Sequence, residues 1–298
     1  MNFISSHLGE FFALTVAVVW GFAVILFKKS GESVHPVSLN LFKNSLALIL
    51  VIPTVLIVGE ELLPSAHWKE YIFLLISGAL GIGISDTLFF MSLNRLGAGL
   101  SAIVDCLYSP FIIGLSMIWL SDVMSILQII GAMLIISAVL TASRMKGGND
   151  ADRRKIIRGF IYGALAMITM AVSIVAIKPL LDRSTLLWVM EIRLIGGILT
   201  LLPIYMVHPR RKQIFVSLFT KSGWKFTVSG SFIGTYLALF LWLAGMKFTQ
   251  TSTAAALNQT SNIFVFIFAT IFLKEAMDNK KVLAIILGVA GTFLVTLG

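Results

Sequence analysis

The stretch Gly78–Asp122 reads GALGIGISDTLFFMSLNRLGAGLSAIVDCLYSPFIIGLSMIWLSD and consists of two apolar spans joined by the short turn at 94–97. A degenerate copy of this stretch begins 153 residues further along the chain. At this offset, glycine, polar and acidic positions coincide in pairs: Gly81 with Gly234, Asp105 with Asn258, and Asp122 with Glu275. Each copy therefore carries a polar residue about seven positions into an otherwise apolar helix. The pattern indicates a duplicated membrane protein.

The composition agrees with this interpretation. The 298 residues are 58% hydrophobic and only 12% charged, whereas soluble domains contain roughly 25% charged residues. Spans of ~20 residues with short connections use nearly the whole length in ten crossings. We therefore expect a polytopic membrane protein without a soluble domain.

Apolar runs bounded by polar residues, Pro or Gly mark the predicted spans. They fall near 10–28, 36–59, 69–93, 98–120, 123–142, 157–178, 184–207, 223–246, 252–273 and 281–297. Runs of this length without strand alternation favour helices, whose backbone hydrogen bonds are satisfied within the span. The predicted fold class is all-α, with ten transmembrane helices. The first span has no cleavage signal around it and is expected to remain.

The duplication extends to the earlier spans with an offset of 150 residues. It aligns Pro53 with Pro203, Lys28 with Lys178 and Lys43 with Arg193. Five spans per copy is an odd number, so the second copy must cross the membrane upside down, as in many secondary transporters. We expect a first five-helix repeat at 1–142, a basic linker loop at 143–156 and an inverted repeat at 157–298.

Loop charge predicts the orientation. Of the 23 Lys and Arg residues, 17 fall in loops on one face, and only Lys69, Lys178, Arg183 and Lys247 fall on the other. Basic loops stay in the cytoplasm. We therefore expect a multi-pass protein of the cell (inner) membrane with both termini outside.

Several function classes are disfavoured. The net charge of +9 lies in loops between apolar spans, so we do not expect a nucleic-acid partner. The chain has one cysteine, Cys106, and its four histidines lie at span ends, without an HExxH motif or a nucleotide-binding loop. We therefore expect no catalytic residues, no metal, no cofactor and no enzyme activity.

Ionisable residues inside the spans are the best functional candidates, because a charge at depth is costly unless it is paired or wet. In the first copy these are Lys43, Asp86 and Asp105, all at ~10–12 Å from the same face by helix rise. They are predicted to form one cluster, and Tyr108 shares the helix face of Asp105. Asp86 and Asp105 are candidates for carrying a coupled proton.

The second copy offers a matching polar set from the opposite face: Glu191, Arg193, Tyr236, Asn258, Gln259 and Asn262. Glu191 is a third candidate for proton coupling. The competing interpretation is structural: Lys43 with an aspartate, and Arg193 with Glu191 or a carbonyl, would lock helices together, and the amides and Tyr236 would bond between helices. Five aromatic residues are expected mainly in packing or facing lipid: Trp20, Phe89, Phe90, Trp242 and Phe264.

Small residues recur at a spacing that allows helices to approach closely. They are Ser77, Gly81 and Ser85 in one span and Ala284, Gly288 and Gly291 in another. Helix association in membranes depends on such close packing. We interpret both series as packing faces.

The paired stretches resemble the ten-span EamA branch of the drug/metabolite transporter superfamily. The resemblance rests on Ser101–Ala102 through Pro110 to Asp122, and on Thr253–Ala255 through Glu275. The second-span basic residues Lys43 and Arg193 fit as well. Asp122 stands where the family usually has Glu, and Ile263 where the first copy has Pro110. The resemblance implies two inverted five-helix repeats around a central cavity and movement of metabolites such as amino acids by alternating access.

The leading hypothesis is a secondary transporter that exports a small polar or zwitterionic metabolite. Lys43 and Arg193 would meet a carboxylate or phosphate, and an acidic residue would meet an amine or carry the proton. A channel or uncoupled facilitator and, less favoured, an intramembrane enzyme are the alternatives. The expected partners are the small-molecule substrate and the lipid bilayer, with the protein as a monomer or homodimer.

Overall fold

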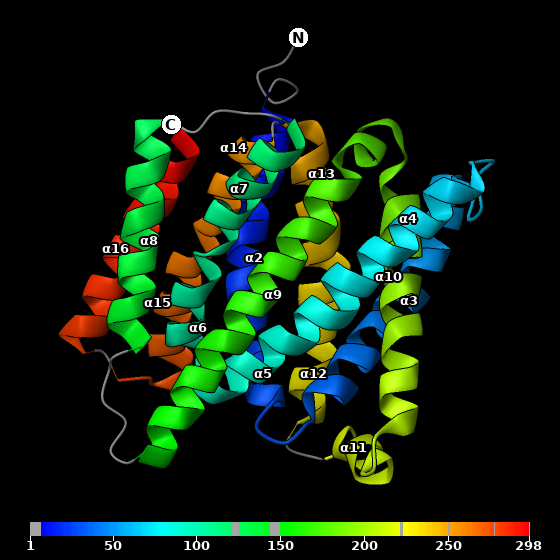
Figure 1. Ribbon diagram of the computed structural model, residues 1–298. Helices are drawn as coiled ribbons and strands as arrows, with labels where there is room; N and C mark the ends of the chain where they lie inside the picture. The colour runs from blue at the N-terminus through cyan, green and yellow to red at the C-terminus, as the bar shows by residue number, and fades with distance from the viewer. Residues whose placement is uncertain are drawn as a thin grey trace.

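The computed structural model describes residues 7–120, 125–143, 150–220, 223–249, 251–276 and 278–297 (Figure 1). Every regular element in these ranges is a helix. Seven helical stretches are long and apolar enough to cross a membrane, and two shorter apolar helices lie at Ile126–Ala142 and Leu257–Leu273. The chain is therefore an all-helical polytopic membrane protein, as predicted.

The described residues up to Ser143 form eight elements. They are α2 (Leu8–Ser30), α3 (Pro36–Val58), α4 (Trp68–Gly78), the π-helix η1 (Ala79–Ser85), α5 (Asp86–Leu96), α6 (Ala98–Asp105), α7 (Tyr108–Leu120) and α8 (Ile126–Ser143). The α4, η1 and α5 segments follow one another without a gap and form one long rod (Figure 1).

The second half forms a comparable series. It comprises α9 (Asp150–Arg183), α10 (Leu186–Val207), the short α11 (Arg211–Ser217), α12 (Trp224–Ser231), the π-helix η2 (Phe232–Leu237), α13 (Ala238–Phe248), α14 (Thr251–Gln259), α15 (Ser261–Leu273) and α16 (Asn279–Leu297). Here too a π-helix lies within one continuous rod, and a break separates two short helices in the span that follows.

Local chemistry fixes several helix ends. His35 precedes Pro36 at the start of α3, and its Nδ1 accepts the N–H of Val37 at 3.3 Å. Gly97 has φ +82°, a backbone conformation that favours glycine, and it separates α5 from α6. Gly59 has φ +79° and ends α3 in the same way.

The predicted linker loop at 143–156 needs correction. Ser143 is the last residue of α8, and α9 begins at Asp150, so 150–156 is helical. This segment lacks Gly and Pro and has acidic residues ahead of basic ones, an order that suits the positive N-terminal end of a helix. The rest of the predicted loop, 144–149, and the span-end residue Asp122 lie outside the described residues.

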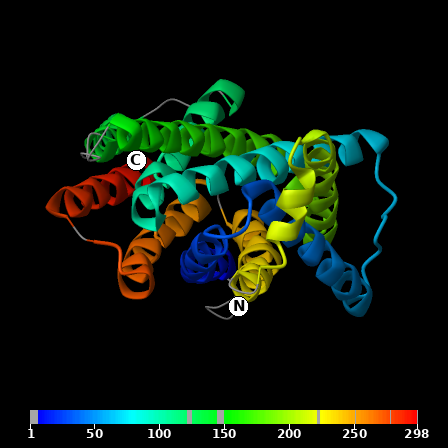
Figure 2. The ribbon, with the colours of Figure 1, turned by 90° about the horizontal axis from the view of Figure 1, so that it is seen from below.

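The predicted packing faces are confirmed. Ser77 and Ser85 donate hydrogen bonds to carbonyls of α9, those of Ser173 and Ala166, at 2.8 and 2.7 Å. Between them, a Cβ at Gly81 would overlap the side chain of Ser173. At the edge of the molecule where Figure 2 shows α16 in red, α8 and α16 run side by side (Figure 1), and Gly291 is in backbone contact with α8. Small residues therefore set the closest helix contacts, as the sequence pattern predicts.

The interior is filled mainly by apolar side chains around α2, which lies among α12, α13, α14 and α15. Phe27, Phe90 and Leu93 in this core are at most 1% exposed. On the outside, large apolar side chains such as Ile57, Ile118 and Val207 remain more than 80% exposed. An outer surface of this kind suits hydrocarbon and not water.

Candidate functional site

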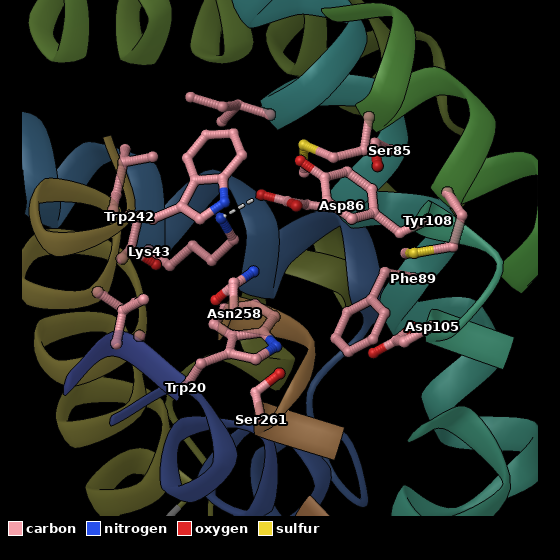
Figure 3. A pocket seen from close by; sticks show the side chains of 18 of the residues that line it. Trp20, Lys43, Ser85, Asp86, Phe89, Asp105, Tyr108, Trp242, Asn258 and Ser261 are labelled. Carbon is pink, nitrogen blue, oxygen red and sulfur yellow. Dashed lines mark hydrogen bonds and ion pairs between the residues drawn. The ribbon is translucent and has the colours of Figure 1, made fainter. Parts of the chain in front are cut away.

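A cavity lies at the centre of the molecule, between helices of both halves of the chain (Figure 3). Its empty space is about 930 Å³, a value that includes the open mouth. Eight of the ten predicted site residues line it: Lys43, Asp86, Asp105, Tyr108, Arg193, Asn258, Gln259 and Asn262. The structure thus brings most of the predicted set together.

Lys43 and Asp86 form a buried ion pair in this cavity (Figure 3). The Nζ of Lys43 lies 2.6 Å from an Asp86 oxygen, and the side chains are 5% and 14% exposed. Nζ also donates to Asn44 Oδ1 at 2.9 Å. Lys43 comes from α3, whereas Asp86 is the first residue of α5, directly after η1. The pair therefore joins α3 to the rod that contains the π-helix.

Asn40, one helical turn before Asn44, holds the π-helix against α3. Its Nδ2 lies 2.9 and 3.0 Å from the carbonyl oxygens of Ile82 and Gly83. Its Oδ1 accepts the side-chain N–H of Asn44 at 3.0 Å. In a π-helix the backbone bonds skip one residue more than in an α-helix, so a side-chain donor from a neighbour readily satisfies a carbonyl there. Hydrogen bonds thus run from Asn40 to Asn44, from Asn44 to Lys43 and from Lys43 to Asp86. They hold the Asp86 carboxylate in its orientation at the cavity.

Asp105 lines the same cavity as Lys43 and Asp86 but is not part of their ion pair. It is 8% exposed, and its carboxylate makes no hydrogen bond or ion pair with any described residue. Asp105 is the last residue of α6, and in Figure 3 it lies beside Phe89, away from Lys43. The helix break at this point places its carboxylate on a different part of the wall.

Arg193 is fully buried, at 0% exposure, yet has no carboxylate partner among the described residues. Its Nη2 makes one long bond to Ser173 Oγ at 3.4 Å, and its guanidinium carbon lies 5.6 Å from the centre of the Trp242 ring. Nε and Nη1 have no hydrogen-bond partner. The structural interpretation that pairs Arg193 with Glu191 is therefore wrong, because Glu191 forms no such ion pair in the described chain.

The amides of the second half complete the polar lining. Asn262 Nδ2 donates to Gln259 Oε1 at 2.7 Å and approaches Cys106 Sγ at 3.5 Å. Asn258, near the end of α14, also lines the cavity. Asn258 and Asn262 thus share one side of this span, as their spacing predicts, even though the helix breaks at Thr260 between them.

Two predicted site residues lie elsewhere. Tyr236 Oη bonds to Thr54 Oγ1 at 2.7 Å, between η2 and α3. Glu191 is 6% exposed, and one of its oxygens, Oε2, has no hydrogen-bond partner. Neither side chain is among the described residues that line the cavity. Both face away from it, although their helices contribute other lining residues.

Sequence reasoning missed several lining residues. Trp20, Phe89 and Trp242 were expected mainly in packing, but they form apolar walls, with Trp20 and Phe89 rings 5.8 Å apart. Asn44 and Ser85 also line the site and directly adjoin the charged residues Lys43 and Asp86. That adjacency is the signal that could have identified them.

Two further contacts involve elements that belong to the cavity helices: an aromatic pair and a carboxylate at a helix start. Phe27 and Phe90 stack edge-on with ring centres 5.0 Å apart. At the turn beyond them, the Glu275 carboxylate accepts the backbone N–H groups of Ala98 and Gly99 at 2.8 and 3.0 Å. These are the first N–H groups of α6, which a carboxylate satisfies well. Glu275 thereby connects the segment after α15, in the second copy, to α6, a cavity helix of the first.

Comparison with known proteins now gives the family. Residues 7–144 and 157–297 each match the EamA-like transporter family. The chain belongs to the EamA-like transporter family. An "Uncharacterized transporter" of Archaeoglobus fulgidus is 25% identical over 287 residues, which cover 96% of this chain and 94% of that protein.

Two further likenesses accompany this match. "Protein PecM" of Dickeya dadantii is 26% identical over 245 residues, covering 80% of this chain and 78% of its own length. One solved crystal structure superposes with a TM-score of 0.69 at 17% identity, over 99% of this EamA-family chain and 98% of the solved one. That likeness concerns the fold alone. The resemblance deduced from the sequence is confirmed, and the protein is a membrane transporter of this family.

Proposed function

We propose that this EamA-family protein is a secondary active transporter that exports a small zwitterionic metabolite, such as an amino acid, by alternating access about the central cavity. The observation that carries the proposal is the cavity itself, whose lining contains both an unpaired cation, Arg193, and an unpaired carboxylate, Asp105. Lys43 and Asp86 balance each other in their ion pair, and Asp105 balances the charge of Arg193 only while it is ionised. A zwitterion would enter such a site without leaving a net charge at depth.

The proposed architecture is ten spans in two inverted five-helix repeats, at 1–142 and 157–298, with the linker between them. Matching helix bounds support it. The π-helices begin at Ala79 and Phe232, the next broken spans begin at Ala98 and Thr251, and the helices after each break begin at Tyr108 and Ser261. All three pairs are 153 residues apart. The two separate family matches support the same division.

The proposed orientation places the protein in the cell membrane with both termini outside and the basic loops in the cytoplasm. Contacts between loops agree with the assignment of faces. Glu10 bonds to Thr249 on the proposed outer face, and the His35 and His208 rings meet on the inner face with centres 5.6 Å apart. With this orientation the Phe27–Phe90 packing and the Glu275 contact lie on the cytoplasmic side of the cavity.

The carboxylates Asp86 and Asp105 are the proposed carriers of a coupled proton. Asp105 is the better candidate, because it has no cation partner, whereas Asp86 already balances Lys43. Burial makes the ionised form of an unpaired carboxyl costly, so proton uptake and cation binding compete for the same group. Glu191 is not proposed for this role, since it does not line the cavity.

The test is uptake into proteoliposomes of amino acids, amines, nucleosides and sugar phosphates, with and without a proton gradient. The parent is compared with Asp105→Asn and with a matched control, Asp152→Asn, an exposed aspartate of α9. We expect saturable flux of an unchanged zwitterionic compound that responds to the gradient in parent and control but not in Asp105→Asn.

Flux of none of the compounds, chemical conversion of the substrate, or ion conductance typical of an open pore would overturn the proposal. Equal gradient-driven flux in all three proteins would remove Asp105 from the coupling mechanism.

A further inference from the structure

The guanidinium of Arg193 occupies a narrow slot in the cavity wall. Gly81 of η1 lies on one side, and a Cβ there would be 3.0 Å from Arg193 Nη2. Ser173 of α9 contributes the single long hydrogen bond at 3.4 Å, and Trp242 of α13 covers the guanidinium at 5.6 Å. The absence of a side chain at Gly81 thus provides the room for this charge. Asp86 is close enough for an electrostatic interaction with Arg193, but its ion pair is with Lys43, and it makes no hydrogen bond or ion pair with the guanidinium.

Tyr108 adds a second donor without a partner at the same place. Its hydroxyl is buried, makes no hydrogen bond, and is close enough to Arg193 for an electrostatic interaction. Both side chains line the cavity. A buried donor without an acceptor costs about 1–3 kcal/mol, and an uncompensated buried charge costs more. A negatively charged acceptor at this wall would satisfy both the Arg193 guanidinium and the Tyr108 hydroxyl.

We propose that Arg193 and Tyr108 form the subsite that binds the carboxylate of the transported substrate. The inference rests on the proposed function and deepens it. Of the two basic candidates in the sequence, Lys43 and Arg193, it assigns the anionic end of the substrate to Arg193. Lys43 is not that residue, since Asp86 and Asn44 already accept from its ammonium group. Arg193 has free Nε and Nη1 donors, and a guanidinium binds a planar carboxylate through two parallel bonds.

The charge balance favours a carboxylate over a phosphate dianion. Arg193 is the cavity cation that makes no ion pair with an acidic residue among the described lining residues. Asp105 is buried without a cation, which favours its neutral form, so it does not supply the missing negative charge. A monoanion at Arg193 cancels one charge with one charge. A dianion would leave excess negative charge next to Asp105 and Asp86 in a medium of low dielectric constant.

The test compares each common L-amino acid with its amide, which keeps the amine and side chain but lacks the carboxylate. Binding to the purified full-length protein in nanodiscs is measured by quenching of tryptophan fluorescence and by the thermal unfolding midpoint. The variants are Arg193→Gln, Tyr108→Phe and a matched control, Arg183→Gln, whose arginine pairs with Glu70 outside the cavity. Inorganic phosphate serves as a separate competitor.

We expect the amino acid that binds the parent to bind about tenfold or more tightly than its amide, since a charge-assisted bond contributes about 1.5–3 kcal/mol. In Arg193→Gln the acid and the amide bind alike, whereas Arg183→Gln keeps the parent's preference. Tyr108→Phe reduces the preference without abolishing it. If Arg193→Gln does not fold, the subsite is still tested by Tyr108→Phe and by the comparison of acid with amide in the parent.

Equal binding of acid and amide in the parent, competition by phosphate but by no carboxylate, or no binding of any acid up to millimolar concentration would each overturn the subsite. The proposed function is judged separately by flux. Gradient-driven flux with no difference between acid and amide leaves transport standing and removes the subsite. Carboxylate binding that depends on Arg193, in a protein that shows no flux, leaves the subsite standing and removes the proposed transport.

Discussion

Lys43 of α3 and Asp86 of α5 form an ion pair of 2.6 Å in which both side chains are largely buried. The pair lies at the junction between η1 and α5, and Asn40 and Asn44 connect it to the carbonyls of the π-helix. It is thus a structural connection as well as part of the cavity lining. Its two members are expected to depend on each other for stability.

Removing one member of this pair should destabilise the protein more than removing both. Lys43→Met leaves the Asp86 carboxylate buried without a cation, and breaking such a pair costs about 3–5 kcal/mol. The double variant Lys43→Met/Asp86→Leu should recover a large part of this loss. The measurement is denaturant unfolding of the detergent-solubilised protein, analysed as a double-mutant cycle. Additive effects of the two single changes would show that the pair makes no coupled contribution.

Glu275 should contribute to stability through the backbone of α6. Replacing it by Gln keeps the size of the side chain but removes the charge that accepts from Ala98 and Gly99. Loss of a capping interaction of this kind costs about 0.5–2 kcal/mol. Hydrogen exchange at the amides of Ala98 and Gly99 should accelerate in Glu275→Gln. Glu61→Gln, in the 59–67 loop, is the control, and unchanged exchange in both variants would contradict the assignment.

The His35 and His208 rings should make stability fall in mildly acidic solution. Burial, followed by the proximity of His208, lowers the pKa of His35 below its usual 6.5. The unfolded chain therefore binds a proton at His35 more readily than the folded protein does, and the folded state is favoured less as pH falls through about 6.5. Unfolding midpoints between pH 8 and pH 5 should decrease less in His35→Gln than in the parent. Identical pH profiles would remove His35 as a cause.

Gly81→Ala should impair the cavity, while Gly114→Ala should not. The added methyl at 81 meets Ser173 and Arg193, whereas a Cβ at Gly114 meets nothing within 4 Å. Overpacking of this kind costs about 1–3 kcal/mol and displaces the neighbouring side chains. Ligand affinity should fall in Gly81→Ala and remain at the parent's level in Gly114→Ala. Equal affinity in both variants would show that Gly81 is not needed to make room for the guanidinium.

The sequence was sufficient for the all-helical, membrane-spanning character of the chain and for eight of the residues that line the cavity, for a physical reason. Hydrophobic runs of membrane length leave few choices of secondary structure. A charged residue deep in such a run must face the protein interior, so Lys43, Asp86 and Arg193 could be recognised without coordinates.

The pairing of these residues could not be predicted in the same way. Depth along a helix follows from residue number, but the direction in which a side chain points depends on how each helix is rotated about its axis. Asp105 has nearly the depth of Lys43 and Asp86 but lies on a different wall, after the break at the end of α6. Glu191, two residues from Arg193, points out of the cavity for the same reason.

The π-helices η1 and η2 make the geometry of the cavity depend on chain length as well as on residue identity. A π turn contains one residue more than an α turn, so the helix beyond it is rotated by about 100° relative to an uninterrupted α-helix. Asp86 directly follows η1, and Ala238, which also lines the cavity, directly follows η2. Deleting a single residue that does not line the cavity, in either segment, would turn the following helix away from the cavity while leaving every lining residue in the chain. Side-chain substitutions alone would not expose this dependence, because it belongs to the spacing of the backbone.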